Sequence, residues 1–260
     1  MKNILMFSCI LVLCSCKKDD KPQYNADVKA PLSVEFDNIA GADDLVLNTG
    51  TYTNTSREIF SISKLKYFVS NFSLIKKDGT KYIVPQDSCY FLIDESDEAT
   101  HEPILNVPEG EYTSISFVLG IDSLRSTLAP DHRTGVLDPA TLAADMYFDQ
   151  NSGYIFFNME GNSAAAGTGN FMYHIGGYGG SSSSTINNIK TITLDLTSRG
   201  TPKVQAGKET NIHLMVDVLK VFTGSTNVNI ATNSLVAFDP FSVSIANNYV
   251  NMIRHDHTEN

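Results

Sequence analysis

The sequence of 260 residues contains no tryptophan and only four cysteines. Three of these cysteines, Cys9, Cys14 and Cys16, lie near the N-terminus, where a secretion signal is processed. Cys89 is then left without a partner, which excludes an internal disulfide in the processed chain. Because Cys89 stands in an apolar stretch at residues 88–93, we expect it to be a small buried hydrophobic residue.

The chain also lacks a long hydrophobic run and an excess of positive charge. The apolar stretch at residues 4–13 has about ten residues, whereas a helix that crosses a bilayer needs roughly twenty. Lys and Arg together number 19 and Asp and Glu number 29, which gives a formal net charge of −10. Such an acidic balance argues against nucleic-acid binding, which requires a basic surface.

The N-terminus has the pattern of a bacterial lipoprotein signal. Lys2 supplies the positive charge, residues 4–13 form the apolar region, and the letters LCSC at residues 13–16 resemble a lipobox. We therefore expect residues 1–15 to be a signal peptide and Cys16 to carry the lipid. Cys14 is the alternative, but Ser15 before Cys16 gives the better small-residue cleavage site.

The residues after Cys16 indicate where in the cell the protein is located. The letters KKDD at residues 17–20 resemble the export tag that sends lipoproteins of the Bacteroidota to the outer face of the outer membrane. This predicts an outer-membrane lipoprotein that is exposed at the cell surface and held to the membrane by its lipid. The alternative is a plain solvated charge cluster. Residues 16–31 are polar with little periodicity and are expected to form a flexible tether.

From residue 32 onward the sequence is of strand type, with alternating patterns and many branched and aromatic residues. Strands are expected at residues 32–36, 59–75, 82–84, 88–93, 112–120, 153–159, 170–175, 189–196, 210–222 and 249–253. This close spacing predicts an all-β fold, an antiparallel β-sandwich that makes residues 32–260 one domain. One short helix is expected near residues 139–147, since Asp138 suits an N-cap and Pro139 the first turn.

Motifs of catalysis are missing from the sequence. We find no nucleophile elbow, phosphate-binding loop, His-Glu-x-x-His helix or Cys-x-x-Cys pair. The glycine-rich run at residues 176–180 has no lysine and no strand-to-helix context, so it reads as a flexible loop. The protein is therefore not expected to be an enzyme.

Histidines are the main candidates for a binding site. In an extended segment, His255 and His257 would point to one face and Asp256 to the other, so both rings could reach one metal ion. Imidazole suits copper and zinc in particular. The alternative for this segment is a frayed polar terminus.

Three further observations concern the remaining histidines. His174 ends a strand just before the glycine loop, where binding residues tend to lie, although a hydrogen-bonded sheet histidine is the alternative. His213 alternates with Met215 along one strand face, which is either a Cu(I) site or simply the less apolar side of the strand. His101 and His132 stand in turn-like contexts and are expected at the surface.

Taken in order, several segments resemble the methanobactin-associated copper-binding protein family, or MbnP-like family. They are KYFVSNFSL (66–74), YFLID (90–94), ISFVLGID (115–122), GVLDP (135–139), MYF (146–148), NSGYIF (151–156), EG (160–161), YHIGG (173–177), VDV (216–218), NYVNM (248–252) and HDH (255–257). The resemblance covers about residues 32–257. It rests on the order and spacing of the segments, because no single motif decides it.

The resemblance implies a secreted or surface β-sandwich that holds one copper ion. Its ligands would be histidines and a kynurenine, which a dihaem partner of the cytochrome c peroxidase type makes by oxidising a tryptophan. Carried over by position, His174, His255 and His257 become the expected metal ligands.

One departure from the family pattern concerns this modified ligand. Where the family has tryptophan after Met146 and Tyr147, this chain has Phe148, and phenylalanine cannot give kynurenine. Either histidines alone bind copper, with Tyr147 as a less expected oxygen donor, or the chain has kept the fold and lost the site. The sequence thus predicts a copper-binding surface lipoprotein, with a surface module that binds glycan or protein as the alternative.

Overall fold

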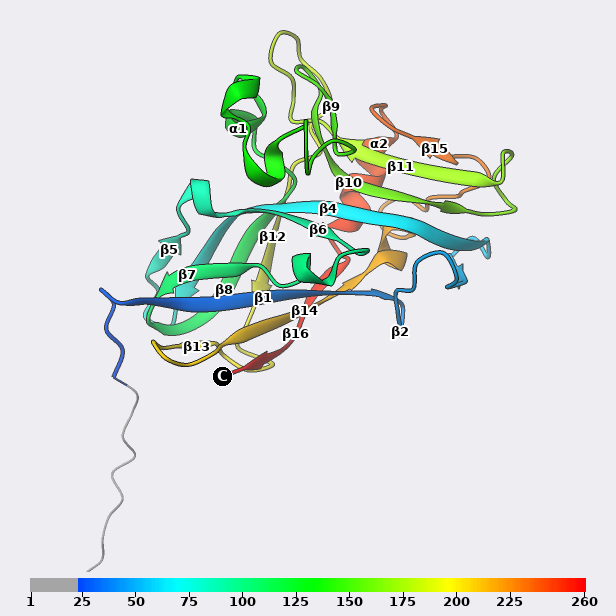
Figure 1. Ribbon diagram of the computed structural model, residues 1–260. Coiled ribbons are helices and arrows are strands. Elements are labelled where there is room, and N and C mark those ends of the chain that lie inside the picture. The colour runs from blue at the N-terminus through cyan, green and yellow to red at the C-terminus, as the bar shows by residue number, and fades with distance from the viewer. Residues whose placement is uncertain (1–22) are drawn as a thin grey trace, which may run out of the picture.

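In a computed structural model the chain is described from residue 23 to residue 260, and strands predominate (Figure 1). The expected signal peptide, the lipidated Cys16 and the tether up to residue 22 lie outside the described residues. Between residues 23 and 260, no helix is long and apolar enough to cross a membrane.

The smaller of the two sheets joins segments from both ends of the described chain. Its strands run in the order β16 (Ile253–Glu259), β14 (Asn211–Asp217), β1 (Lys29–Ala40) and β2 (Asp43–Asp44), and β7 (Ile104–Pro108) also pairs with β1. β1 and β14 run parallel, while β16 is antiparallel to β14. Strand alternation along β1 buries Val34 and Phe36 and leaves Glu35 and Asp37 on the outer face.

The larger sheet is built around the long strand β4 (Ile59–Lys76). It runs in the order β12 (Lys190–Asp195), β8 (Gly110–Leu119), β4, β10 (Gly153–Asn162), β11 (Asn170–Gly176) and β15 (Leu235–Val236). Short strands join its sides, namely β3 (Tyr52–Thr53), β5 (Lys81–Ile83), β6 (Tyr90–Asp94), β9 (Tyr147–Asp149) and β13 (Lys203–Val204). Most neighbouring strands are antiparallel, with parallel pairs at β1–β14 and β11–β15.

Aromatic side chains fill the space between the two sheets. Phe36 of β1 makes edge-to-face contacts with Tyr67 of β4 at 6.2 Å and with Phe117 of β8 at 5.6 Å between ring centroids. Phe72 stacks on Phe117 at 5.3 Å. All four rings are fully buried, and this packing of sheet on sheet confirms the predicted all-β sandwich.

The helix expected at residues 139–147 is wrong. Residues 139–145 form turns and β9 follows. The Asp138 carboxylate accepts the amide of Ala140, while its carbonyl accepts those of Thr141 and Ala143, so local side-chain bonding replaces a helical ladder. The helices are α1 (Ser123–Ser126), α2 (Ser242–Tyr249) and the 3-10 turns η1 (Gln86–Ser88), η2 (Glu98–Thr100), η3 (Pro130–His132), η4 (Gly135–Leu137) and η5 (Val218–Phe222).

Two smaller features concern the expected boundaries and the free cysteine. β1 begins at Lys29, before the domain start expected at residue 32, and it pairs there with β7. The amide of Asn25 already donates to Glu109, so the polar segment docks onto the domain before the first strand. Cys89 is buried, as predicted.

Candidate metal centre

A β-bulge in β16 decides where its histidines point. His257 pairs with His213 of β14, and His255 pairs with the next residue, Leu214, so Asp256 is the extra residue between them. The bulge interrupts the alternation of faces. His255 turns inward and is only 7% exposed, whereas Asp256 and His257 lie beside His213 on the outer face. The expectation that His255 and His257 share a face is therefore wrong.

The three outward residues form a compact set of possible metal ligands. One donor atom from each of His213, Asp256 and His257 lies within 4.8 Å of the others. Oδ2 of Asp256 is 2.9 Å from Nδ1 of His257 and 3.7 Å from Nδ1 of His213. Around a tetrahedral ion with ligands at about 2.1 Å, donor atoms stand about 3.4 Å apart, so only small side-chain shifts are needed.

The free ring nitrogen of His213 favours a ligand role. Its Nδ1 is buried and makes no hydrogen bond within the described chain, although the acceptor Asp256 faces it. A buried polar atom without a partner is costly, and a bound ion would provide one. The rings of His213 and His257 lie 4.7 Å apart between centroids, so both are near the carboxylate of Asp256.

The carboxylate and the exposed histidine influence each other's protonation. The hydrogen bond from His257 holds the pKa of Asp256 below its ordinary value, and the same bond raises the pKa of His257. A metal ion must displace the proton from His257 to bind there, so acid is expected to compete with the metal.

His255 is a buried residue of the fold and does not belong to this group of possible ligands. Its Nε2 lies 3.0 Å from Oγ1 of Thr258, while its Nδ1 is buried without a partner. Burial lowers the pKa of His255 from its ordinary value, because it disfavours the charged ring in the folded state.

This burial predicts a pH dependence of stability. As the pH falls through the ordinary pKa of histidine, the unfolded chain binds a proton at residue 255 more readily than the folded chain, so the free energy of unfolding falls. We expect the metal-free protein to lose more stability between pH 7.5 and pH 5.5 than the His255→Gln variant, measured by urea denaturation. The raised pKa of His257 acts with the opposite sign in both proteins and cancels in the comparison. Equal losses in the two proteins would contradict the burial effect.

His174, the other predicted ligand, belongs to a network of charged side chains on the larger sheet. Its Nε2 lies 2.9 Å from Oε1 of Glu160, and Lys64 pairs with the same oxygen at 3.2 Å. Lys64 also reaches Asp145 at 3.4 Å. The structure does not place His174 in the group of possible ligands described above.

The position at which the family pattern has tryptophan provides no metal ligand in this chain. Phe148 of β9 packs on Phe238 at 5.8 Å between ring centroids and offers no donor atom. His174 is engaged by Glu160 and His255 faces inward, so the described residues do not fit a copper ion held by a kynurenine with these two histidines.

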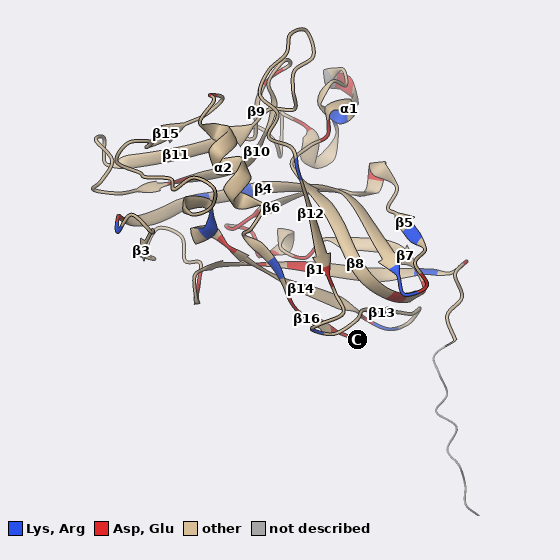
Figure 2. Ribbon diagram, turned by 180° about the vertical axis from the view of Figure 1, so that it is seen from behind, with Lys and Arg blue, Asp and Glu red and all other residues tan. Residues whose placement is uncertain are grey.

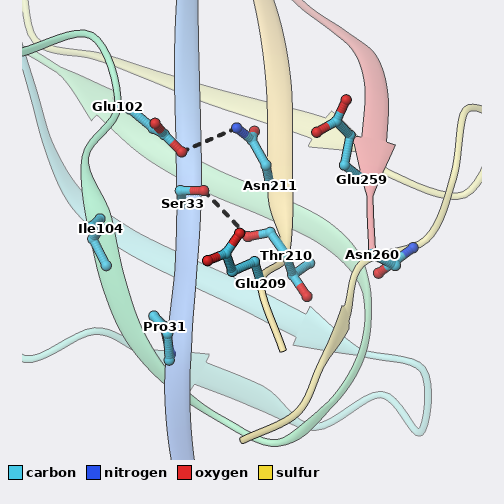
Figure 3. Close-up of a pocket in the computed structure, with 9 residues that line it drawn as sticks. All are labelled: Pro31, Ser33, Glu102, Ile104, Glu209, Thr210, Asn211, Glu259 and Asn260. Carbon is cyan, nitrogen blue, oxygen red and sulfur yellow. Dashed lines mark hydrogen bonds between the residues drawn. The ribbon is translucent and has the colours of Figure 1, made fainter. Parts of the chain in front are cut away.

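An acidic hollow of about 620 Å³ lies next to the cluster (Figure 3). Its lining includes Glu102, Glu209 and Glu259, and Glu102 accepts a hydrogen bond from Asn211 of β14. Asn211 and Glu259 are a cross-strand pair that follows the His213–His257 pair along the same two strands. Acidic positions also recur along β1 (Figure 2). The acids on this side of the smaller sheet favour cations, and Arg254 and Arg199 offset part of their charge at Asp256.

Comparisons with known proteins agree with this fold. The sequence model of the family described as MbnP matches residues 29–244. Among solved structures, MbnP from Methylosinus trichosporium is 14% identical, with 82% of each chain covered and a TM-score of 0.56. No curated protein matches the chain. At this low identity, the structural likeness shows a shared fold.

Proposed function

Because this chain belongs to the MbnP family, we propose that it is a binding protein that holds a copper ion at His213, Asp256 and His257. The observation that carries the proposal is the convergence of these three side chains on the outer face of the smaller sheet. They come from two strands and meet only because of the bulge in β16.

The donor set favours copper in its Cu(II) state. Two imidazoles and one carboxylate are nitrogen and oxygen ligands, which suit Cu(II) or zinc better than soft Cu(I). Met215, the soft donor next to His213 on β14, has its sulfur engaged by the guanidinium of Arg254. The copper assignment rests on the resemblance to copper-binding proteins, and zinc is the closest competitor.

The proposed site is made of unmodified side chains and is therefore independent of an oxidising partner. The family's kynurenine would need a tryptophan, and the sequence has none. The proposal is one of binding and not of catalysis. A lipid on Cys16 would hold the domain at the outer membrane. The domain would lie close to the membrane, because β1 begins at Lys29.

Copper titration of the soluble chain that begins after Cys16 tests this proposal. We expect wild-type protein to take up Cu(II) in competition with a chelator, and His257→Ala to bind at least about tenfold more weakly because a ligand is lost. His174→Ala is the matched control, since it removes an outward histidine from another sheet and should leave the affinity unchanged. Affinity that falls in His174→Ala but not in His257→Ala would overturn the proposal.

A further inference from the structure

The second ring nitrogen of His213 faces its own pair of acids. Nε2 lies 3.6 Å from Oδ2 of Asp37 and 3.8 Å from Oε1 of Glu35, on the side of the ring away from Asp256. We propose that His213 bridges two divalent metal ions, with Asp256 and His257 on one side and Glu35 and Asp37 on the other. This inference rests on the proposed function, because it adds a second ion to that site.

The parallel pairing of β1 with β14 builds the second half of this centre. Glu35 stands opposite His213 in the register, and Asp37 follows it two residues later on the same outer face. Their carboxylates therefore approach the nitrogen from two sides. Both distances are close to the donor separation of about 3.4 Å expected around a tetrahedral ion.

Within residues 23–260, no lysine or arginine side chain forms an ion pair with Glu35 or Asp37. Among the ion pairs of residues 23–260, those of Glu35 and Asp37 are made with His213 alone. Asn211 donates to Oε2 of Glu35 at 2.9 Å, which fixes the carboxylate and leaves Oε1 toward the ring. The Asp37 and Glu35 side chains are 33% and 40% exposed, so both are accessible to an ion, and the two carboxylates would have to move toward each other to bind it.

The shared ring and three carboxylates supply negative charge for two divalent ions. An imidazole binds one metal through its free nitrogen, and a second metal–nitrogen bond forms when the remaining N–H bond breaks and its proton passes to solvent. The bridging imidazolate and the carboxylates of Glu35, Asp37 and Asp256 then carry four negative charges. Arg254 and Arg199, which pair with Oδ1 of Asp256 at 3.1 and 3.9 Å, offset part of this charge and leave Oδ2 toward the two rings.

The two sides differ in chemistry. The side with Asp256 and His257 shares two imidazoles and suits copper, whereas the side with Glu35 and Asp37 has two carboxylates and accepts zinc as readily as Cu(II). We therefore expect a centre that fills with two Cu(II) ions when copper is the only metal, or with one copper and one zinc when both are supplied.

Metal stoichiometry is the first test. The chain that begins after Cys16 is loaded with Cu(II), passed through a desalting column and analysed for copper per protein. We expect two ions in wild-type protein and one in Asp37→Asn, with the affinity for the first ion unchanged. Asp43→Asn is the matched control, because Asp43 is an exposed acid of the same sheet in β2, and it should still hold two ions.

Electron paramagnetic resonance is the second test, because two Cu(II) ions joined by an imidazolate couple magnetically. The signal of the two-copper protein should be weaker than twice that of the one-copper protein, and zinc in the second position should restore an isolated Cu(II) spectrum. A single bound ion in wild-type protein, or two ions that Asp37→Asn leaves intact, would overturn the bridge while the proposed function stands. Absence of any binding would overturn both.

Discussion

Replacement of His213 by alanine is expected to remove both metal ions at once. Its ring provides Nδ1 to the side with Asp256 and His257 and Nε2 to the side with Glu35 and Asp37. Loss of a partner behind a metal ligand already costs about 10- to 100-fold in affinity, so loss of a shared ligand should cost more than about 100-fold on both sides. Copper titration with metal analysis measures the effect, and His257→Ala and Asp37→Asn should each lose one ion.

The control for His213→Ala is the fold itself. His213 lies on the outer face of the smaller sheet, away from the aromatic core, so its removal should leave the circular dichroism spectrum and the metal-free stability close to those of wild-type protein. A folded His213→Ala protein that still holds one copper ion with wild-type affinity would show that the ring is not shared.

Replacement of Phe36 by alanine is expected to give the largest loss of stability. The ring is fully buried and joins the two sheets through its contacts with Tyr67 and Phe117. Removal of a buried phenylalanine side chain leaves a cavity and costs about 3–5 kcal/mol, and the tightly packed interior cannot collapse to fill it. Urea denaturation of the metal-free protein measures this change in the free energy of unfolding.

Phe148→Ala is the matched variant for this prediction. Phe148 is only partly buried and contacts Phe238 outside the space between the sheets, so its truncation should cost clearly less. Similar losses in the two variants would mean that the contacts of Phe36 do not hold the sheets together. The comparison also examines the position where tryptophan is expected from the family pattern.

Most of the strands could be predicted from the sequence because local alternation determines them. The strand expected at residues 249–253 is wrong, since α2 ends at Tyr249, a turn follows and β16 begins only at Ile253. The alternation at residues 32–36 predicts a strand with one buried face, and β1 has that form. The helix at residues 139–147 could not be separated from turns, because Asp138 and Pro139 suit both. The helix α2 gave no signal in the sequence analysis, since it is short and is stabilised by burial of Ile245, Ala246 and Tyr249.

The candidate site was predicted only in part, for a reason that lies in the pairing of strands. The sequence predicted His257 as a ligand and offered His213 as a candidate, but it placed Asp256 on the face opposite to His255 and His257. A bulge depends on how β16 meets β14, and the alternation within one segment carries no record of the partner strand. The contacts of Glu160 with His174 and with Lys64 likewise join residues that are separated along the chain.

The parallel pairing of β1 with β14 has a consequence for when the protein can take up metal. Glu35 and His257 stand near opposite ends of the described chain, and β14 brings them to one place only once the smaller sheet has formed. In an unfolded chain these side chains are separate, weak ligands, so metal binding selects the folded state and stabilises it. A cell that exports this protein unfolded would therefore send it across the membrane empty, and the protein would acquire its metal at its destination.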